Sequence, residues 1–503
     1  MTRTRMDAWG LTRTEGDWPA VLDAYERAVG LMRALDPAQG RPTNPLSWQF
    51  QAAIHGRDLT PATPDNGSTL WNGCQHQSWF FFPWHRMYLL AFEAIVQHFL
   101  SDDQWSLPYW YSIDPDDPKT AVLPPAFRDT TRPTNNLFTE LRSMSANGGD
   151  PLTNSALGQI DLATPLLDAL RADVFSTPDG IATFGGGERS TPITQGDEMG
   201  LLEGAPHGGV HVLVGNDFNP NTGDPISFGW MGDPATAGLD PIFWLHHANI
   251  DRIWQMWLDL DTSHTNPPDG DLAWFDTTFT FPKVGGGTIA WKVGEVMDTI
   301  KLGYQYESVA SPSALAAPVF AGGPGIEIGE AEMPQQLPPQ VIGATVDVAV
   351  SSDEPVTVAL SEPADVGLAA EGAVIGSRAY LRIEGITGTA AAPLYQVYLD
   401  VPEGESPEEH PELRVGAIST FGIQAASRTD EIHSGTGLTT VFEITRVRDA
   451  LADAGRWDPA RVSVAFRPVI PVPSDPAAAQ ELAQQAQARE VDVRAARIAV
   501  VVT

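Results

Sequence analysis

Histidines set in aromatic, apolar segments constrain this chain most. Residues 76–85, 207–211 and 240–260 each carry two histidines in or beside an apolar run. Any one of these histidines can be an ordinary core residue bonded to a backbone carbonyl, or a surface residue on a helix. An accidental set of five or six, with aromatic flanks and prolines that begin helices, is far less probable. Together the segments predict one buried metal centre.

The first two segments suggest how their histidines converge. His76 and His85 bracket the sequence QSWFFFPW, an aromatic sheath that keeps water out. The chain must turn between them, and Pro83 marks a start for the helix that follows. In EGAPHGGVHVLVG, His207 and His211 stand four residues apart. If Pro206 begins a helical turn, both imidazoles project from one face, the geometry for gripping one metal ion.

The third segment, residues 240–260, predicts an apolar helix behind Pro241 with adjacent histidines at 246 and 247. Neighbours on a helix point about 100° apart, so one imidazole can enter a metal site while the other packs outside it. Asp251 lies four residues beyond His247 on the same face. We expect Asp251 to orient an imidazole or to anchor Arg252.

Ligand type indicates the metal. The chain contains no Glu-x-x-His, which disfavours a carboxylate-rich di-iron site, and no His-Glu-x-x-His. Its single cysteine, Cys74, excludes a cysteine-rich zinc site and an intramolecular disulfide framework. All-imidazole ligation suits copper better than zinc, nickel or iron.

Charge and hydropathy exclude several classes of partner. The formal net charge of −34 disfavours nucleic acid and anionic membranes. No apolar run is long enough for a membrane helix or a signal peptide, so we expect a cytoplasmic protein. No sequence feature indicates an oligomeric state.

The pattern changes along the chain. Helical periodicity marks residues 17–35, with Asp17 as a candidate cap, and residues 83–100 and 240–260. Residues 309–340, which contain six prolines, read as a linker. Short alternating runs follow, interrupted by candidate helices at 445–455 and 475–491. The prediction is an α+β multidomain chain: a mainly helical domain at 1–308 and an antiparallel β-sandwich or barrel at 341–503.

The segments IHG, CQHQSWFFFPWHRMYLLAFE, PHGGVHVLVG and DPIFWLHHANIDRIW resemble, in that order, the copper-binding segments of type 3 copper proteins. This family comprises tyrosinases, catechol oxidases (polyphenol oxidases) and molluscan-type haemocyanins. The resemblance implies a four-helix bundle around two copper ions, with His246 set aside and Phe243 packed on the ligand imidazoles. It implies three ligands for each copper: His55, His76 and His85 for the first, and His207, His211 and His247 for the second.

The resemblance also implies a reaction, in which O2 is the co-substrate and o-diphenols become o-quinones. Glu203 matches a glutamate that holds a water near the second copper and could assist deprotonation of a small phenolic substrate. Gly208 stands where relatives proficient on monophenols often carry asparagine, which favours o-diphenols. Pro234 stands where plant enzymes place a bulky phenylalanine, which favours larger phenols or o-aminophenols. The alternative is a haemocyanin-like oxygen carrier without turnover.

Two further expectations follow from the resemblance. The Cys74-x-His76 spacing matches relatives in which the cysteine sulfur is bonded to a carbon of the ligand imidazole, so we expect a thioether there. Residues 341–503 resemble the β-rich domain of plant polyphenol oxidases and haemocyanins. In relatives this domain can cover the copper site and keep the enzyme latent. We expect the same here, and therefore expect cleavage in the linker to raise activity.

Overall fold

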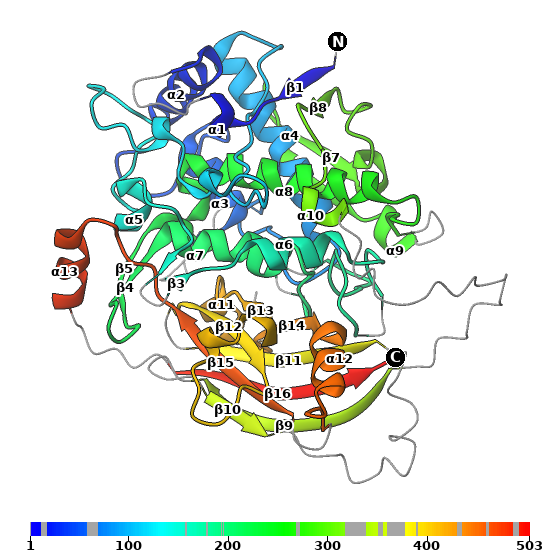
Figure 1. Cartoon of the computed structure of the whole chain (residues 1–503). Helices are drawn as coiled ribbons and strands as arrows, with labels where there is room; N and C mark the ends of the chain where they lie inside the picture. Colours follow the sequence, from blue (N-terminus) through cyan, green and yellow to red (C-terminus); the bar gives the residue numbers. More distant parts are fainter. Residues whose placement is uncertain are drawn as a thin grey trace.

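The computed structural model places a helix-rich part above a strand-rich part that packs against it (Figure 1). It describes residues 2–11, 18–57, 69–155, 158–177, 180–192, 194, 196–267, 272–316, 339–350, 356–359, 378–388, 391–429, 435–458, 462–485 and 492–503. The predicted helical first part and strand-rich second part are both confirmed.

Four helices build the interior of the first part: α2 (Ala20–Arg33), α3 (Trp48–His55), α4 (Phe81–Leu100) and α8 (Pro241–Leu260). Helix α8 starts where the sequence predicts, with Pro241 in the first turn and the Asp240 side chain accepting a hydrogen bond from the Ile242 amide. Helix α4 begins two residues before Pro83, which the first turn tolerates. Pro19 precedes α2, and Asp17 lies outside the described residues.

Shorter elements surround these helices. The helices are α1 (Ala8–Leu11), α5 (Met144–Gly148), α6 (Ala163–Leu170), α7 (Gly209–Gly215), α9 (Leu272–Phe275) and α10 (Ser313–Ala316). The strands are β1 (Arg3–Arg5), β2 (Asn154–Ser155), β3 (Gly158–Gln159), β4 (Asn216–Phe218), β5 (Pro225–Phe228), β6 (Thr278–Pro282), β7 (Thr288–Lys292) and β8 (Tyr304–Tyr306). Strands β1 and β8 pair in parallel, so the beginning of the chain lies beside the end of the first part.

The second part contains two four-stranded antiparallel sheets, ordered β10-β15-β12-β13 and β14-β11-β16-β9. Their strands are β9 (Gln340–Val350), β10 (Val356–Ala359), β11 (Ala379–Gly388), β12 (Leu394–Leu399), β13 (Arg414–Ile418), β14 (Leu438–Glu443), β15 (Ser463–Val469) and β16 (Val493–Val502). Helix α11 (Ile423–Ser427) is additional. The two predicted helices are α12 (Thr445–Asp453) and α13 (Pro476–Gln484). Residues 486–491 of the second predicted helix lie outside the described residues.

The two parts share their interiors. The core cluster of the helical part includes Leu394, Phe421, Val469 and Ile470 from the second part. In return, Met199 belongs to the core cluster of the two sheets. Buried apolar area that crosses the boundary stabilises the docked arrangement.

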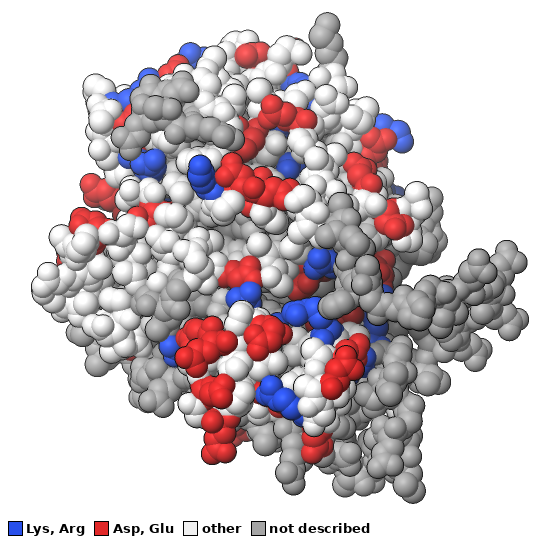
Figure 2. Space-filling view, in the orientation of Figure 1, with Lys and Arg blue, Asp and Glu red and all other residues white. Residues whose placement is uncertain are grey.

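Three predictions stay predictions: the four-helix bundle, the sandwich or barrel, and the domain limits. Most of the predicted linker, residues 309–340, lies outside the described residues. Among the residues that are described, no helix is long and apolar enough to span a membrane. The face in Figure 2 carries more acidic than basic side chains, in keeping with the net charge of −34.

Candidate metal centre

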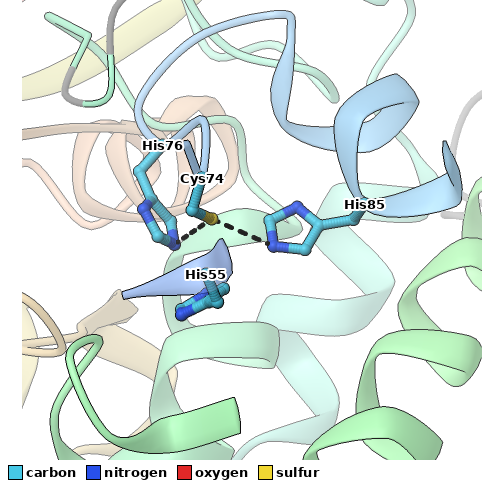
Figure 3. Close-up of side chains that lie close together, drawn as sticks. All are labelled: His55, Cys74, His76 and His85. Atoms are coloured by element: carbon cyan, nitrogen blue, oxygen red, sulfur yellow. Dashed lines mark hydrogen bonds between the residues drawn. The ribbon is translucent and has the colours of Figure 1, made fainter. Parts of the chain in front are cut away.

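Three histidines from separate elements meet at the first cluster, together with the single cysteine (Figure 3). His55 is the last residue of α3, His85 lies in the first turns of α4, and His76 is in the loop between them. One nitrogen from each histidine and the Cys74 sulfur all lie within 4.8 Å of one another. The predicted turn between His76 and His85 therefore brings both side chains to one point.

The second cluster combines two histidines around the start of α7 with the adjacent pair on α8. One nitrogen from each of His207, His211 and His246 lies within 4.8 Å of the others. This group thus includes His246, which the resemblance set aside. His247 lies beside it, with its Nε2 3.4 Å from the Nε2 of His211 and its ring centroid 5.0 Å from that of His207. The His247 ring also stacks on His85 of the first cluster, with centroids 4.2 Å apart and planes 9° apart. His247 thus joins the two clusters, whereas His246 stacks on His207 with centroids 5.4 Å apart.

A kink precedes His207. Gly204, with φ −62° and ψ −119°, interrupts the segment Glu203–Gly208, and the helical backbone that follows it leads into α7. Pro206 lies in the first turn after this kink, as the sequence predicts. The imidazoles of His207 and His211 still converge, with ring centroids 4.7 Å apart.

Backbone carbonyls fix the orientation of four imidazoles. Each carbonyl accepts a hydrogen bond from an Nδ1–H, and the donor–acceptor pairs are His55 with Pro234 (2.9 Å), His85 with Phe81 (2.8 Å), His207 with Glu203 (3.0 Å) and His211 with Met231 (2.9 Å). Since a carbonyl only accepts, Nδ1 carries the proton in each ring. The lone pair of each Nε2 is left free to bind a metal.

The electrostatics of the two clusters suit a metal. Six of the seven imidazoles are buried and that of His76 is partly buried. Loss of contact with water lowers the pKa values of all seven, that of His55 to about 4 and that of His246 to about 3. Neutral imidazoles are the form that binds metals. The Nε2 atoms of His55 and His207 have no hydrogen-bond partner in the described part of the chain. Such orphaned buried nitrogens are costly unless an ion satisfies them, so the residues fit two copper ions.

Cys74 points into the first cluster. Its buried sulfur lies 3.5 Å from His76 Nε2 and 3.3 Å from His85 Nε2. Burial, together with the nearby Glu203 carboxylate, raises the pKa of the thiol well above its usual value. The thiol is therefore poorly suited to act as a nucleophile in the metal-free protein.

Glu203 is buried, and its side chain reaches the loop that carries His76. Its Oε1 accepts a hydrogen bond of 2.7 Å from the amide of Gln77, the residue after His76. Its Oε2 has no partner among the described residues. Burial raises the pKa of this carboxyl to about 8. It can therefore hold or release a proton near neutral pH.

The other predicted pocket residues surround the histidines. The Phe243 ring contacts His247, with centroids 4.3 Å apart, and His55, with centroids 4.8 Å apart. Pro234 orients His55 through its carbonyl, a role that its side chain does not reveal in the sequence. Gly208 follows His207 directly and faces the second part of the chain.

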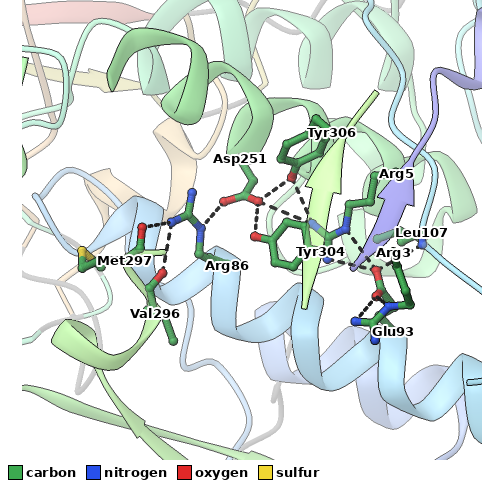
Figure 4. Close-up of polar contacts among 10 residues, drawn as sticks. All are labelled: Arg3, Arg5, Arg86, Glu93, Leu107, Asp251, Val296, Met297, Tyr304 and Tyr306. Carbon is green, nitrogen blue, oxygen red and sulfur yellow. Dashed lines mark hydrogen bonds and ion pairs between the residues drawn. The ribbon is translucent and has the colours of Figure 1, made fainter. Parts of the chain in front are cut away.

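Asp251 has partners that differ from those we expected. It binds neither an imidazole nor Arg252, but accepts hydrogen bonds from Arg86 (2.5 Å), Arg5 (3.4 Å), Tyr304 (2.7 Å) and Tyr306 (Figure 4). Arg252 donates instead to the Ser308 carbonyl and to Asn249. The two arginines lower the pKa of the Asp251 carboxyl despite its burial.

This network ties the metal-binding helices to the chain's first strand. Arg86 follows His85 on α4, and Asp251 lies one turn beyond His247 on α8. Arg5 of β1 also pairs with Glu93 of α4 at 3.0 Å. The network therefore fixes how α4 and α8 lie against each other, and through them His85 and His247.

One residue that contacts the histidines was not predicted from the sequence. Phe421, in the turn after β13, stacks on His211 with ring centroids 4.0 Å apart and planes 14° apart. It also meets His207 and His76 edge-on, with centroids 5.8 and 6.2 Å away. An aromatic residue in a β-rich segment with no histidine neighbours gives no sequence signal for this position.

Comparisons with known proteins agree with this geometry. Residues 45–260 match the family model described as the common central domain of tyrosinase. Tyrosinase HcTyr1 of Hahella sp. (strain CCB-MM4) is 31% identical over 504 residues, which cover 93% of this chain and 95% of that protein. The chain belongs to the tyrosinase family. This confirms the type 3 copper resemblance, and the two histidine clusters are groups that could hold the metal ions of such a centre.

Other relatives of this tyrosinase-family chain are plant enzymes. The chloroplastic polyphenol oxidase of Malus domestica is 32% identical over 305 residues, 58% of this chain but only 47% of the plant protein. The match therefore spans about half the length of that relative. Residues 335–480 match a domain described only as one of unknown function.

Solved structures share the fold over both parts. Latent aurone synthase, a polyphenol oxidase, superposes with a TM-score of 0.61 and 20% identity, covering 100% of this chain and 89% of the other. Latent apple tyrosinase gives a TM-score of 0.61 and 23% identity, covering 99% and 97%. The order of a helical part followed by a strand-rich part is therefore shared with these proteins.

Proposed function

We propose that this tyrosinase-family chain uses O2 to oxidise o-diphenols to o-quinones. In the balanced reaction, two diphenols and one O2 give two quinones and two waters. The six histidines His55, His76, His85, His207, His211 and His247 would hold two copper ions. When bound, copper supplies the electron relay between phenol and O2.

The observation that best supports a phenolic substrate is the position of Phe421. Its ring lies parallel to the His211 imidazole with centroids 4.0 Å apart. A flat aromatic ring therefore fits against this imidazole, and aromatic rings in such offset stacks attract each other. A phenol in the same place would direct its hydroxyl groups at the two histidine clusters.

Glu203 is the candidate proton acceptor for this reaction. Its Oε2 is free of partners among the described residues, and its pKa of about 8 lies near neutral pH. A carboxyl group with such a pKa can take the phenolic proton, directly or through a water, and release it later.

The preference for o-diphenols, with o-aminophenols as a variant, rests on two positions. Unlike asparagine, Gly208 has no side-chain amide that could polarise a water beside Glu203, and this absence disfavours monophenols as substrates. Pro234 is smaller than the phenylalanine expected there in plant enzymes, which favours a wider mouth once the second part has moved away.

The test is a turnover assay on copper-loaded protein under air. Catechol, 4-methylcatechol, tyrosol and o-aminophenol are compared, and O2 consumption is followed together with product absorbance. We expect catechols to react fastest and tyrosol slowest. Reversible O2 binding without product on any substrate, before and after protease treatment, would favour the oxygen-carrier alternative.

We also propose that the second part holds the enzyme latent, with Phe421 in the substrate's place. Phe421→Ala should raise the rate of the uncleaved protein about tenfold or more, because the stacked ring no longer competes with substrate. Phe228→Ala, at an exposed residue of β5, is the matched control. Equal rates for Phe421→Ala and the unaltered protein, both before and after cleavage in the linker, would contradict this proposal.

A further inference from the structure

Gly208 and Gly209 are consecutive glycines in helical backbone that does not require them. Gly208 has φ −66° and ψ −26°, and Gly209 has φ −63° and ψ −42°, which are ordinary right-handed helical values. Glycine weakens a helix relative to alanine because it loses more conformational freedom. The reason for these two glycines must therefore lie in what packs against them.

Side chains of the second part occupy the space where their Cβ atoms would be. A Cβ at Gly208 would lie 2.3 Å from Ser419 Oγ, 3.0 Å from Ser419 Cβ and 3.3 Å from Phe421 Cβ. A Cβ at Gly209 would lie 2.9 Å from Leu394 Cδ2. Real side chains do not approach this closely, so any side chain at Gly208 must displace the segment that carries Ser419 and Phe421.

Rotation of the Ser419 hydroxyl does not relieve the whole contact, because Ser419 Cβ would still lie 3.0 Å from the added Cβ. Rotation would also break the hydrogen bond of 3.2 Å that Ser419 Oγ accepts from the Phe421 amide. The Thr420 hydroxyl donates a hydrogen bond of 2.5 Å to the Ala392 carbonyl. The Ile423 amide closes the turn on the Thr420 carbonyl at 3.0 Å. The turn 419–422 is therefore braced within its own domain, and a push on Ser419 moves Phe421 with it.

We propose that Gly208 is the contact point that lets the turn 419–422, which carries Phe421, dock against the histidines. Because Gly208 has no side chain, Ser419 can approach α7, and this approach sets how deeply Phe421 enters between the histidines. The segment that carries His207 and His211 thus leaves room for the second part of the chain. The inference rests on the proposed latency and names the contact that regulates it.

The experiment uses the full-length chain and three variants. Gly208→Ala adds the Cβ, and Gly208→Ala with Ser419→Gly also removes the atoms it would strike. Gly10→Ala, in α1, is the control, because its Cβ would lie 3.6 Å from the nearest atom. We measure hydrogen–deuterium exchange in residues 414–427 and the ratio of rates after and before cleavage in the linker.

We expect Gly208→Ala to speed exchange in residues 414–427 and to lower the activation ratio, each roughly tenfold. The double variant should return both towards the unaltered protein, and Gly10→Ala should change neither. Ser419→Val, which leaves the sequence of the helical part intact, should act like Gly208→Ala even if that variant folds poorly.

Unchanged exchange in both Gly208→Ala and Ser419→Val would overturn the inference, whatever the activity. Faster exchange without oxidation of any phenol would instead refute the proposed oxidase activity, and it would still support the contact between Gly208 and the turn 419–422. Equal loss of rate before and after cleavage, with unchanged exchange, would show that Gly208 serves only the copper helix and would also overturn the inference.

Discussion

At the scale of single residues, Cys74 lies among the three histidines of the first cluster. Its sulfur faces both His76 Nε2 at 3.5 Å and His85 Nε2 at 3.3 Å, and the chain has no other cysteine. The thioether to His76 stays a prediction. Its formation would remove one hydrogen from sulfur and one from an imidazole carbon, with O2 as the oxidant.

We expect copper-matured protein to have an intact mass lower by two hydrogens, carried by a cross-linked peptide that joins Cys74 to His76. Such a bond would fix the rotation of the His76 ring. Mass spectrometry of digested protein checks this, with Cys74→Ser as the control. A thiol that alkylates in the denatured protein, or a cross-link to His85, would contradict the prediction.

The adjacent histidines of α8 give a second prediction at this scale. His247 lies 3.4 Å from His211, nitrogen to nitrogen, and its ring stacks on His85 of the first cluster, whereas the His246 ring stacks on His207. His247→Ala should therefore lower bound copper from about two ions to about one, and His246→Ala should retain about two. Metal analysis after dialysis measures this. The opposite order would assign the ligand to His246.

At the scale of elements, the pairing of β1 with β8 places a charged strand in the interior. The Arg5 side chain is fully buried between Glu93 and Asp251. Its guanidinium group also lies over the Tyr304 ring, with the guanidinium carbon 3.9 Å from the ring centroid. The network joins α4 and α8, so its loss should loosen the positions of His85 and His247.

Arg5→Leu should lower the free energy of unfolding of the helical part by about 3 kcal/mol or more, because it leaves two buried carboxylates short of a partner. Copper retention should fall as well. Arg3→Leu is the control, because the Arg3 side chain is 20% exposed and its pair with Glu93 lies at the edge of the network. Calorimetry compares the two, and an equal effect of both changes would contradict the role given to Arg5.

At the scale of the whole molecule, ion pairs join the two parts around the site. Three arginines of the second part each bind an acid of the first: Arg378 with Asp173, Arg382 with Glu198 and Arg414 with Asp161. The Arg414 and Asp161 side chains are each less than one-fifth exposed. Pairs of this kind are screened less by salt than fully exposed ones.

Arg414→Glu should raise the rate of the uncleaved protein about fivefold, since loss of about 1 kcal/mol of interdomain attraction favours the undocked state. The added Asp161→Arg should restore latency. Arg494→Glu, whose partner Asp347 lies within the second part, is the control and should leave the rate unchanged. A rise of similar size in Arg494→Glu would show that net charge, not this pair, controls docking.

Features that leave a periodic pattern or a fixed spacing in the sequence could be predicted. The helices bearing His85 and His247, the aromatic flank around Phe81 and the strand-rich second part all have local patterns of period 3.6 or 2. The kink at Gly204, two residues before Pro206, was not predicted, because glycine adopts many backbone conformations and its position alone does not reveal which one.

The remaining features depend on long-range contacts. The carbonyl that orients His55 belongs to Pro234, 179 residues away, and backbone atoms have no sequence signature. Asp251 finds Arg86 and Arg5, which lie 165 and 246 residues away, rather than its neighbour Arg252. Phe421 reaches the centre only because two domains dock. Such pairings are set by the tertiary fold and not by local pattern.

The parallel pairing of β1 with β8 also bears on how the protein is made. The Arg5–Tyr306 hydrogen bond joins residues 301 positions apart, so β1 can pair only after β8 has been synthesised. Contacts of such high sequence separation form slowly, and chains emerge from the ribosome at about 5–20 residues per second. Completion of the helical domain, and with it a fully positioned copper site, must follow synthesis of Tyr306.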